Sequence, residues 1–386
     1  PGIWITNYEK LHHFIEAEYD AIVLDESARL RDFTSKTRNL LITSFTHIPY
    51  RLCCSALPSP NDLGELGNHA EFLGVLKRTE MLAHFFVHDA QGSASIGDWR
   101  LKGHAKEEYW KWVAQWAVYV RRPADLGHEE EDALFDLPPL TVRVEKTATH
   151  FVPPGELFPR LTAGIRGRID ARRASTQDRI ALAVDIINRS EEQWIIWCTL
   201  NEEQELIRKA LGSRCVSIEG ATPDEDKITL EQQWREKAVP ILITKSSIFG
   251  HGLNWHHCRN MLYLSTDDSF ERYFQSTRRI WRFGQIYPVN VILLSSPAEQ
   301  GVLDNLNRKE QEANLLAEGI ITHMKTTQIE QVRQAPIDTN DYPTDEATGT
   351  HWRMLLGDSI ELTKTLPDHH VGLSICSIPF SHLYTY

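Results

Sequence analysis

The chain has 386 residues, enough for two or three domains, and its hydrophobic content of 41% and charged content of 24% predict globular units with substantial cores. Its formal net charge of −12 excludes a general attraction to nucleic acid, so any DNA contact depends on local basic surface. No run of eighteen apolar residues and no signal peptide is found, and the six cysteines have neither CxxC nor disulfide-framework spacing. These features predict reduced thiols in a cytoplasm-like compartment and no membrane partner.

The first third of the chain predicts an α/β unit. Residues 19–26, YDAIVLDE, form a short apolar strand that ends in two carboxylates, as at the carboxyl edge of a parallel sheet. Residues 50–55 predict a second buried strand, and helical spacing of apolar residues predicts a helix over residues 106–120. The charged and then proline-rich composition of residues 121–141 indicates a connection between domains.

The next part of the chain alternates strands with helices, which predicts a parallel sheet with right-handed crossovers. Strands are predicted at residues 194–198, 215–220, 239–244, 260–265 and 289–295, and helices at residues 176–189, 202–211 and 230–237. A polar helix follows at 299–335, then a linker at 336–350. From residue 351 a third unit begins, with strands expected near 353–356 and 371–376 that could pair side by side.

One segment crowds arginines together: residues 275–285, QSTRRIWRFGQ, contain Arg278, Arg279 and Arg282. Guanidinium groups so close together are costly on a packed face unless they meet an anion, and their fork geometry suits phosphate. Taken alone, the cluster also fits a solvated helix face.

Several segments in the right order resemble the motifs of one family. Residues 22–30, IVLDESARL, resemble the DEAH-type motif II, and residues 53–73 resemble motif III, with Leu57 where that family usually has threonine. Residues 244–255, TKSSIFGHGLNW, resemble motif V, and residues 275–285 resemble motif VI. Residues 3–297 therefore resemble a Swi/Snf-type superfamily-two DNA helicase of phage-like character, a DNA-stimulated ATPase with two RecA-like lobes.

The resemblance implies roles for individual residues. Asp25 would hold Mg²⁺, and Glu26 would orient and activate the attacking water. Arg279 and Arg282 would act as arginine fingers in a catalytic set that also includes Gln275. The implied nucleotide-binding positions are Gly250, Gly252, Asn254 and Gln285, with the glycines allowing close backbone approach and Asn254 capping its loop. The implied cofactors are ATP and Mg²⁺, and the implied partner is double-stranded DNA in a bacterial or phage-infected cell.

The 386 residues contain no GxxxxGK[ST] run, so we expect the phosphate-binding loop to lie upstream of Pro1 and the chain alone to hydrolyse ATP poorly. The expected fold is α/β, with two RecA-like parallel-sheet lobes of which the first is incomplete. The expected boundaries are 1–125 for the end of the first lobe, 126–150 for the connection, 151–298 for the second lobe, 299–350 for the helix and linker, and 351–386 for the third unit.

The third unit resembles the opening of a DNA amino-methyltransferase, a Rossmann-like fold. Its residues Gly357-Asp358, Leu366-Pro367-Asp368 and Ser377-Ile378-Pro379-Phe380 follow the order of that family's catalytic motif. The resemblance implies that Asp358, Ser377, Pro379 and Phe380 belong to the methyltransferase motif. Ser377 and Phe380 would line a pocket for a flipped base, because a polar residue and carbonyls accept from an exocyclic amine while an aromatic ring stacks on the base, and Pro379 would rigidify the turn. S-adenosylmethionine would bind only to the complete domain. An ordinary strand and turn with a buried phenylalanine is the alternative.

Three functions remain open at this stage. The chain belongs to a DNA-dependent ATPase or translocase fused to a methyltransferase, to a methyltransferase with a helicase-like targeting part, or to an inactive module that clamps DNA. The run His256-His257-Cys258 suggests a metal site, but no second ligand cluster lies at metal-site spacing, so a packed turn is expected.

Overall fold

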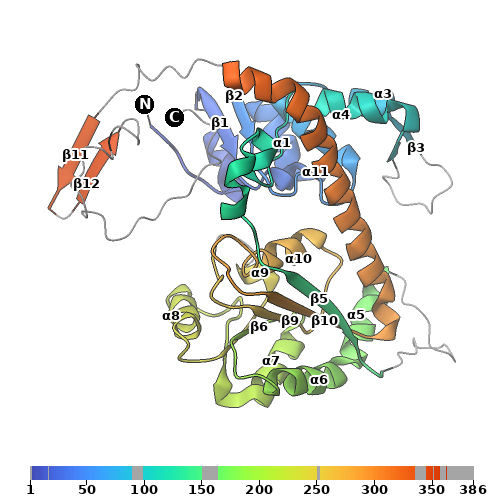
Figure 1. Cartoon of the computed structure of the whole chain (residues 1–386), viewed down its shortest axis with the longest axis vertical. Coiled ribbons are helices and arrows are strands. Elements are labelled where there is room, and N and C mark those ends of the chain that lie inside the picture. The colour runs from blue at the N-terminus through green and yellow to red at the C-terminus, as the bar shows by residue number, and fades with distance from the viewer. Residues whose placement is uncertain are drawn as a thin grey trace.

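The computed structural model describes residues 2–15, 17–88, 99–149, 164–249, 253–334, 345–350, 352–356 and 362. They form two lobes joined by one long helix and, apart from them, a small hairpin (Figure 1). None of the described helices is long and apolar enough to cross a membrane.

The described residues of the first lobe form two small sheets and four α-helices. Its strands are β1 (Ala21–Leu24) and β2 (Tyr50–Cys53), which pair in parallel, and β3 (Phe86–His88) and β4 (Trp99–Leu101), which pair antiparallel. Its helices are α1 (Lys36–Phe45), α2 (Leu66–Leu73), α3 (Arg78–Phe85) and α4 (Lys106–Val113). The strands predicted near residues 19–26 and 50–55 are confirmed in position, and their parallel pairing brings the acids after β1 to one edge of the sheet. The burial predicted for the second strand is wrong, because Tyr50 is exposed and the other residues of β2 are only half-buried.

The helix predicted for residues 106–120 is too long, because α4 ends at Val113. Beyond it the chain turns, and the hydroxyl of Tyr119 donates to the carbonyl of Ala56, 3.3 Å away, a contact that a continued helix would not make. Pro123 then begins a short 3₁₀ turn, η5 (Pro123–Leu126), at the position where proline is tolerated.

The second lobe is built on a six-stranded, all-parallel sheet in the order β5-β10-β9-β6-β8-β7. Its strands are β5 (Leu140–Lys146), β6 (Trp194–Trp197), β7 (Cys215–Ser217), β8 (Ile241–Thr244), β9 (Asn260–Tyr263) and β10 (Val289–Ser295). Its helices are α5 (Gly164–Ala174), α6 (Thr176–Asn188), α7 (Asn201–Leu211), α8 (Asp224–Arg235), α9 (Ser246–Phe249) and α10 (Phe270–Thr277). The predicted α/β class with a parallel sheet is confirmed here.

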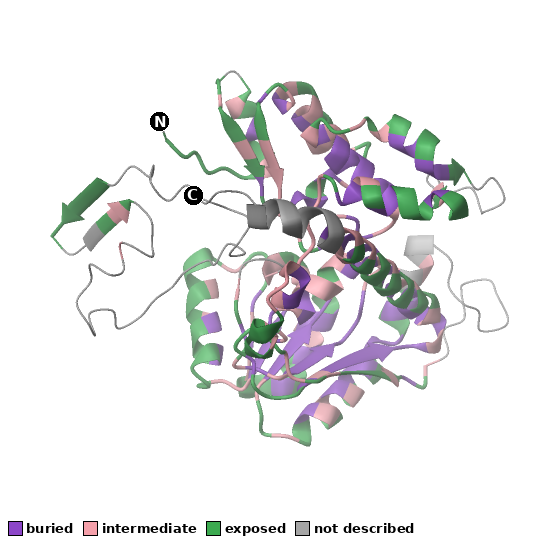
Figure 2. Ribbon diagram, turned by 45° about the horizontal axis from the view of Figure 1, so that its top comes forward, coloured by how far each residue is buried: buried purple, intermediate pink, exposed green. Residues whose placement is uncertain are grey.

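Both faces of this sheet are covered. Along β6, Ile195 and Trp197 belong to one core, with Trp234 and Trp255, whereas Trp194 and Ile196 belong to the other. Successive side chains of a strand point to opposite faces, so a strand with helices on both sides reads as a continuous apolar run. Figure 2 shows the result, a band of buried strands through this lobe. β5 was not predicted, because its position in a proline-rich stretch indicated a connection, and it joins the sheet as an exposed edge.

The helix α11 (Gln300–Gln334) follows the second lobe and runs back along the first (Figure 1). It begins beside Glu299, whose carboxylate pairs with the buried Arg172 (3.2 Å) and with Arg179. Further along, its Leu316 and Ile320 join the core of the first lobe. The polar helix predicted over residues 299–335 is confirmed, but its packing against both lobes was not predicted.

The last described element is a hairpin of β11 (Asp345–Gly349) and β12 (Trp352–Leu356), paired antiparallel. The strand predicted near residues 353–356 is confirmed, but the linker predicted over 336–350 is wrong at residues 345–349, which form β11. Only two residues separate the strands, so they pair locally as a hairpin, and the described partner of β12 is β11. Residues 371–376, the partner expected from the sequence, lie outside the described residues.

Candidate functional site

The proposed site lies where the two lobes meet, and its acidic half comes from the first lobe. Asp25 and Glu26 follow β1 directly, and Tyr8 donates from its hydroxyl to the carbonyl of Asp25 over 2.6 Å. Glu26 has a left-handed backbone, with φ 49° and ψ 48°, which is uncommon for any residue but glycine. Such a conformation costs free energy and persists only where surrounding contacts fix it, and it concentrates at functional sites.

The contacts that fix the backbone at Glu26 come from the end of β2 and from α2. The amide of Ser27 donates to the carbonyl of Cys54 over 2.9 Å, and the amide of Cys54 donates to Leu24 over 2.8 Å, so the end of β2 holds the turn after β1. The hydroxyl of Ser27 also lies 3.2 Å from Nε2 of His69, which is buried on α2. Burial lowers the pKa of His69 to about 4, so this imidazole is neutral near neutral pH.

The second lobe contributes α10 and the turn after it. Nε2 of Gln275 lies 3.3 and 3.4 Å from the two carboxylate oxygens of Glu26. Four residues later, Arg279 is buried, and burial foremost, together with the charge of Arg282, lowers its pKa to about 10, while the carboxylate of Glu26 raises it in part. The structure therefore brings Glu26, Gln275 and Arg279 together from the two lobes.

The three arginines of residues 275–285 have different surroundings. Both Arg279 and Arg282 donate to the carbonyl of Leu253, at 3.0 and 3.4 Å. Arg278 instead lies over the rings of Trp281 and Phe274, 4.3 and 5.2 Å from their centroids. Nε of Arg279 is buried and makes no hydrogen bond to the described residues.

The remaining predicted positions fall into two groups. The side chain of Asn254 accepts from the backbone amide of His256 (3.3 Å) and lies 2.8 Å from ring nitrogen Nδ1 of the same residue, so it caps the turn at this histidine. Gln285 is buried, and its amide donates to the carbonyls of Cys258 and Ile280, at 3.0 and 3.2 Å, so it shapes the turn after motif VI. Its contact with nucleotide stays a prediction. Gly250, Gly252, Asp358, Ser377, Pro379 and Phe380 lie outside the described residues.

The run His256-His257-Cys258 forms a turn, as expected. Cys258 is buried, with its thiol against the carbonyl of Asn260 at 3.3 Å, and the ring of His257 packs on Trp234. No group of three or more metal-ligating side chains occurs in the part of the chain that the structure describes.

Sequence reasoning missed two contacts between the lobes. Arg31, beyond the acids, forms an ion pair with Glu271 on α10, 240 positions away, and nothing in a single sequence links two such charges. Leu57 is buried against Phe270 of α10 and against Val302 and Leu306 of α11. The motif III position without threonine is thus an apolar contact that joins both lobes.

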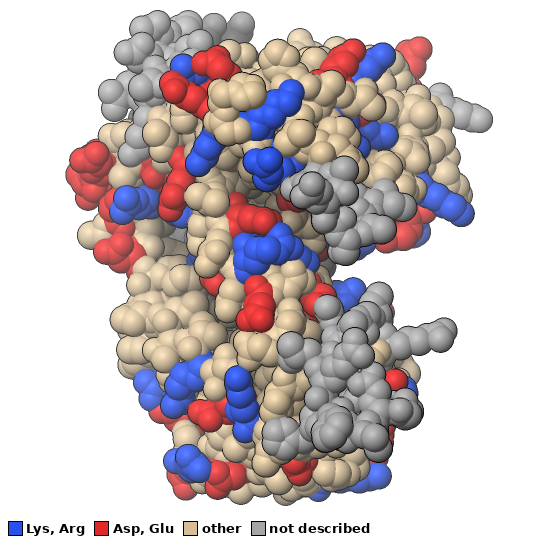
Figure 3. All heavy atoms as spheres, turned by 90° about the vertical axis from the view of Figure 1, so that its right-hand side faces the viewer, with Lys and Arg blue, Asp and Glu red and all other residues tan. Residues whose placement is uncertain are grey.

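Charge on the described surface is mixed. On the face that α11 crosses, lysine and arginine side chains alternate with acidic ones, and neither sign forms a continuous tract in that view (Figure 3). DNA binding over this face would therefore rest on few local contacts, in accordance with the net charge of −12.

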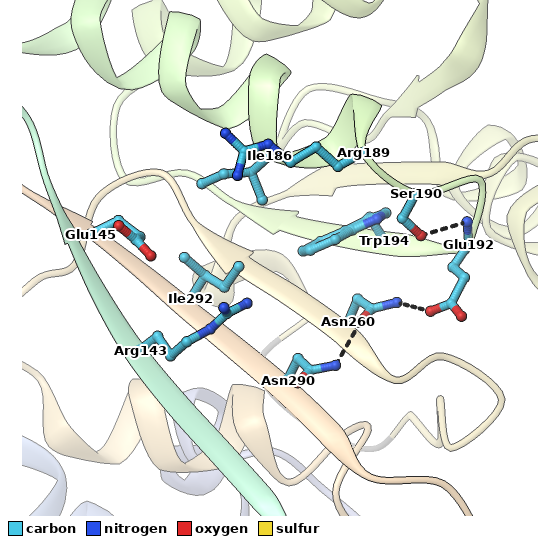
Figure 4. Close-up of a pocket in the computed structure, with 10 residues that line it drawn as sticks. All are labelled: Arg143, Glu145, Ile186, Arg189, Ser190, Glu192, Trp194, Asn260, Asn290 and Ile292. Carbon is cyan, nitrogen blue, oxygen red and sulfur yellow. Dashed lines mark hydrogen bonds between the residues drawn. The ribbon is translucent and has the colours of Figure 1, made fainter.

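A cavity among the described residues lies away from this site. It has a volume of about 330 Å³ and lies near the amino ends of β6, β9 and β10, beside Trp194, Asn260 and Asn290 (Figure 4). The candidate site instead lies beyond the carboxyl ends of β1 and β9. The cavity and the site therefore lie at opposite ends of the strands.

Comparison with known proteins bears on the second lobe. Residues 178–284 match the family described as the helicase conserved C-terminal domain. The match runs from α6 through the arginines of motif VI and covers less than half of the chain. It supports a superfamily-two, helicase-like fold for this region, of the kind found in nucleic-acid-dependent ATPases.

A comparison with curated protein sequences gave no match. Among solved structures, the C-terminal part of the Fun30 ATPase domain is similar over 38% of this chain and 55% of that chain, with 18% identity and a TM-score of 0.30. The chain thus spans about half the length of that structure, and a likeness so distant carries no argument about activity.

Proposed function

We propose that the chain is the acidic half of the first motor lobe and the whole second lobe of an ATP-driven translocase on double-stranded DNA. The observation that carries the proposal is the meeting of Glu26 with Gln275 and Arg279 across the lobes, at 3.3 Å for the glutamine. Carboxylates and arginines that are gathered at one site suit a magnesium nucleotide, since both charges find partners in it.

In this proposal Asp25 holds Mg²⁺ together with the phosphates. Glu26 orients water, and Arg279 and Arg282 stabilise the charge that develops on the transferring phosphoryl group. ATP supplies the free energy for movement. The 386 residues contain no GxxxxGK[ST] run, so the proposal assigns none of them to a phosphate-binding loop.

The test compares two arginines that are four residues apart. Arg282→Ala in the full-length protein should lower DNA-stimulated phosphate release by about 10³-fold or more while ATP binding stays within severalfold, because a finger acts on the transition state. Arg278→Ala is the matched control, since this side chain lies over Trp281 and Phe274. A tenfold or smaller loss in Arg282→Ala, or an equal loss in both variants, contradicts the assignment.

A second arm tests the partner. Affinity of the 386-residue chain for duplex DNA should fall steeply between 50 and 200 mM salt, because phosphate contacts release counterions. Binding that does not change with salt, or no binding at all, counts against the nucleic-acid part of the proposal. Tight binding without turnover in the full-length protein favours the inactive clamp instead.

The fused methyltransferase stays a proposal that rests on the order of residues 357–380 alone. We propose that Ser377 and Phe380 line a pocket for a flipped base in the complete domain. Transfer of a labelled methyl group from S-adenosylmethionine to DNA by the full-length protein tests it, with Phe380→Ala as the variant that should lose activity.

A further inference from the structure

One face of α10 touches the acidic loop of the first lobe at two places. Glu271 forms the ion pair with Arg31, and Gln275 contacts the carboxylate of Glu26 at 3.3 and 3.4 Å. Residues four apart on a helix lie on the same face, so the two contacts are one helical turn from each other. The loop from Glu26 to Arg31 and the helix therefore meet along a line and not at a single point.

The backbone of Arg31 is held in place by a residue of α2. Its carbonyl accepts from Nδ2 of Asn68 over 2.9 Å, and Asn68 is fully buried on α2. Oδ1 of Asn68 accepts in turn from Nε of Arg38 over 3.2 Å, and Arg38 is paired with Glu71. A buried amide with partners on both sides has little freedom, so it fixes the backbone from which Arg31 extends.

The other end of the loop is held by the next residue of the same helix. His69 lies 3.2 Å from the hydroxyl of Ser27, directly after Glu26. Both ends of the 3₁₀ turn η2 (Ser27–Leu30) are thus fixed by consecutive residues of α2. Because the turn is held, a contact made by Arg31 bears on the position of Glu26.

The ion pair is partly shielded from water. The side chain of Glu271 is 15% exposed and that of Arg31 is 33% exposed. Pairs of this kind are screened less by salt than pairs in open solvent, and removal of one partner leaves the other charge poorly solvated. The pair is therefore suited to fixing the position of α10 relative to the loop from Glu26 to Arg31.

We propose that Arg31 is a positioning residue that, through Glu271, sets the register of α10 against the acidic loop. In that register Gln275 contacts the carboxylate of Glu26, and Arg279 follows four residues later. The inference deepens the proposed function and rests on it for the roles of Glu26 and Arg279. Neither Arg31 nor Glu271 touches the reacting atoms, so their effect is on geometry alone.

Charge reversal tests the pair. Arg31→Glu and Glu271→Arg, each alone, should lower kcat of the full-length protein by about tenfold to a hundredfold, with KM for ATP changed much less, because a misplacement near 1 Å costs this much. The double variant restores opposite charges and should recover kcat to within severalfold. Arg189→Glu, which breaks the exposed pair with Asp185 on α6, is the control and should have no effect.

A second experiment measures structure and does not depend on ATP hydrolysis. Hydrogen exchange in the 386-residue chain should show faster exchange of the amides of residues 270–277 in each single variant and recovery in the double variant. If the wild-type protein hydrolyses no ATP, the proposed function fails and this arm still decides the inference. Unchanged exchange and unchanged kcat in the single variants, or a double variant no better than the singles, would overturn it.

Discussion

The two lobes contribute to one candidate site from very different scaffolds. In the second lobe, β6, β8 and β9 are buried along their whole length, with helices against both faces of the sheet. In the first lobe, β1 and β2 pair only with each other among the described strands, and Val23 and Tyr50 remain 61% and 72% exposed. The arginines thus extend from a densely packed body, and the acids follow a sparsely packed pair of strands.

The difference shows how the acids are kept in place without a large sheet. Backbone bonds to Cys54, the imidazole of His69 and the inter-lobe contacts of α10 hold their loop, and α11 completes the core of the first lobe. Polar contacts and the helix α11 therefore hold the site residues of the first lobe in place, whereas the packing of buried strands does so in the second lobe. Three predictions test this contrast, in addition to those given with the proposals.

The largest effect is expected from truncating a strand centre in each lobe. Ile195→Ala in β6 removes a fully buried side chain and should lower the free energy of unfolding by about 2–5 kcal/mol. The matched variant Val23→Ala, in the exposed strand β1, should change it by about 0.5 kcal/mol or less. Denaturant unfolding followed by circular dichroism measures both. Similar losses in the two variants would mean that β1 is covered in solution.

The pH dependence of stability should report on His69. Its pKa is about 4 in the folded chain, below the ordinary 6.5, so between these values the unfolded chain binds the extra proton and stability falls as the pH is lowered. The loss approaches about 3 kcal/mol at 1.36 kcal/mol per pKa unit. His69→Gln cannot take up the proton, so unfolding curves at pH 7 and pH 4.5 should differ less in this variant than in the wild type. An equal difference in both proteins contradicts the argument.

The smallest effect is expected at the contact of α11 with α4. A Cβ added at Gly319 would lie 2.5 Å from ring atoms of Trp110, so Gly319→Ala should destabilise the first lobe by about 1–3 kcal/mol. Gly301→Ala, on the same helix with nothing within 4 Å, should instead stabilise by up to about 1 kcal/mol. Near-ultraviolet circular dichroism of the tryptophans during unfolding distinguishes them. Stabilisation by both variants would show that α11 does not pack on α4 in solution.

The sequence alone determined the features whose signal is local. The apolar runs at β6, β8, β9 and β10 predicted a parallel sheet, because strands covered on both faces are apolar at every position. The order of the acidic pair and the arginine run resembles the motifs of a nucleotide-dependent motor, and the site that this resemblance implies stays a prediction.

Only the tertiary structure decided which of these side chains meet. Arg31 and Glu271 are separated by 240 positions, and the burial of Leu57 depends on Phe270 and α11. The edge strand β5 carries exposed valines in a proline-flanked segment, so its own residues gave no sign of a sheet until the neighbouring strand β10 supplied the pairing. Contacts of this kind depend on distances that the fold sets, and a linear pattern of residues does not contain them.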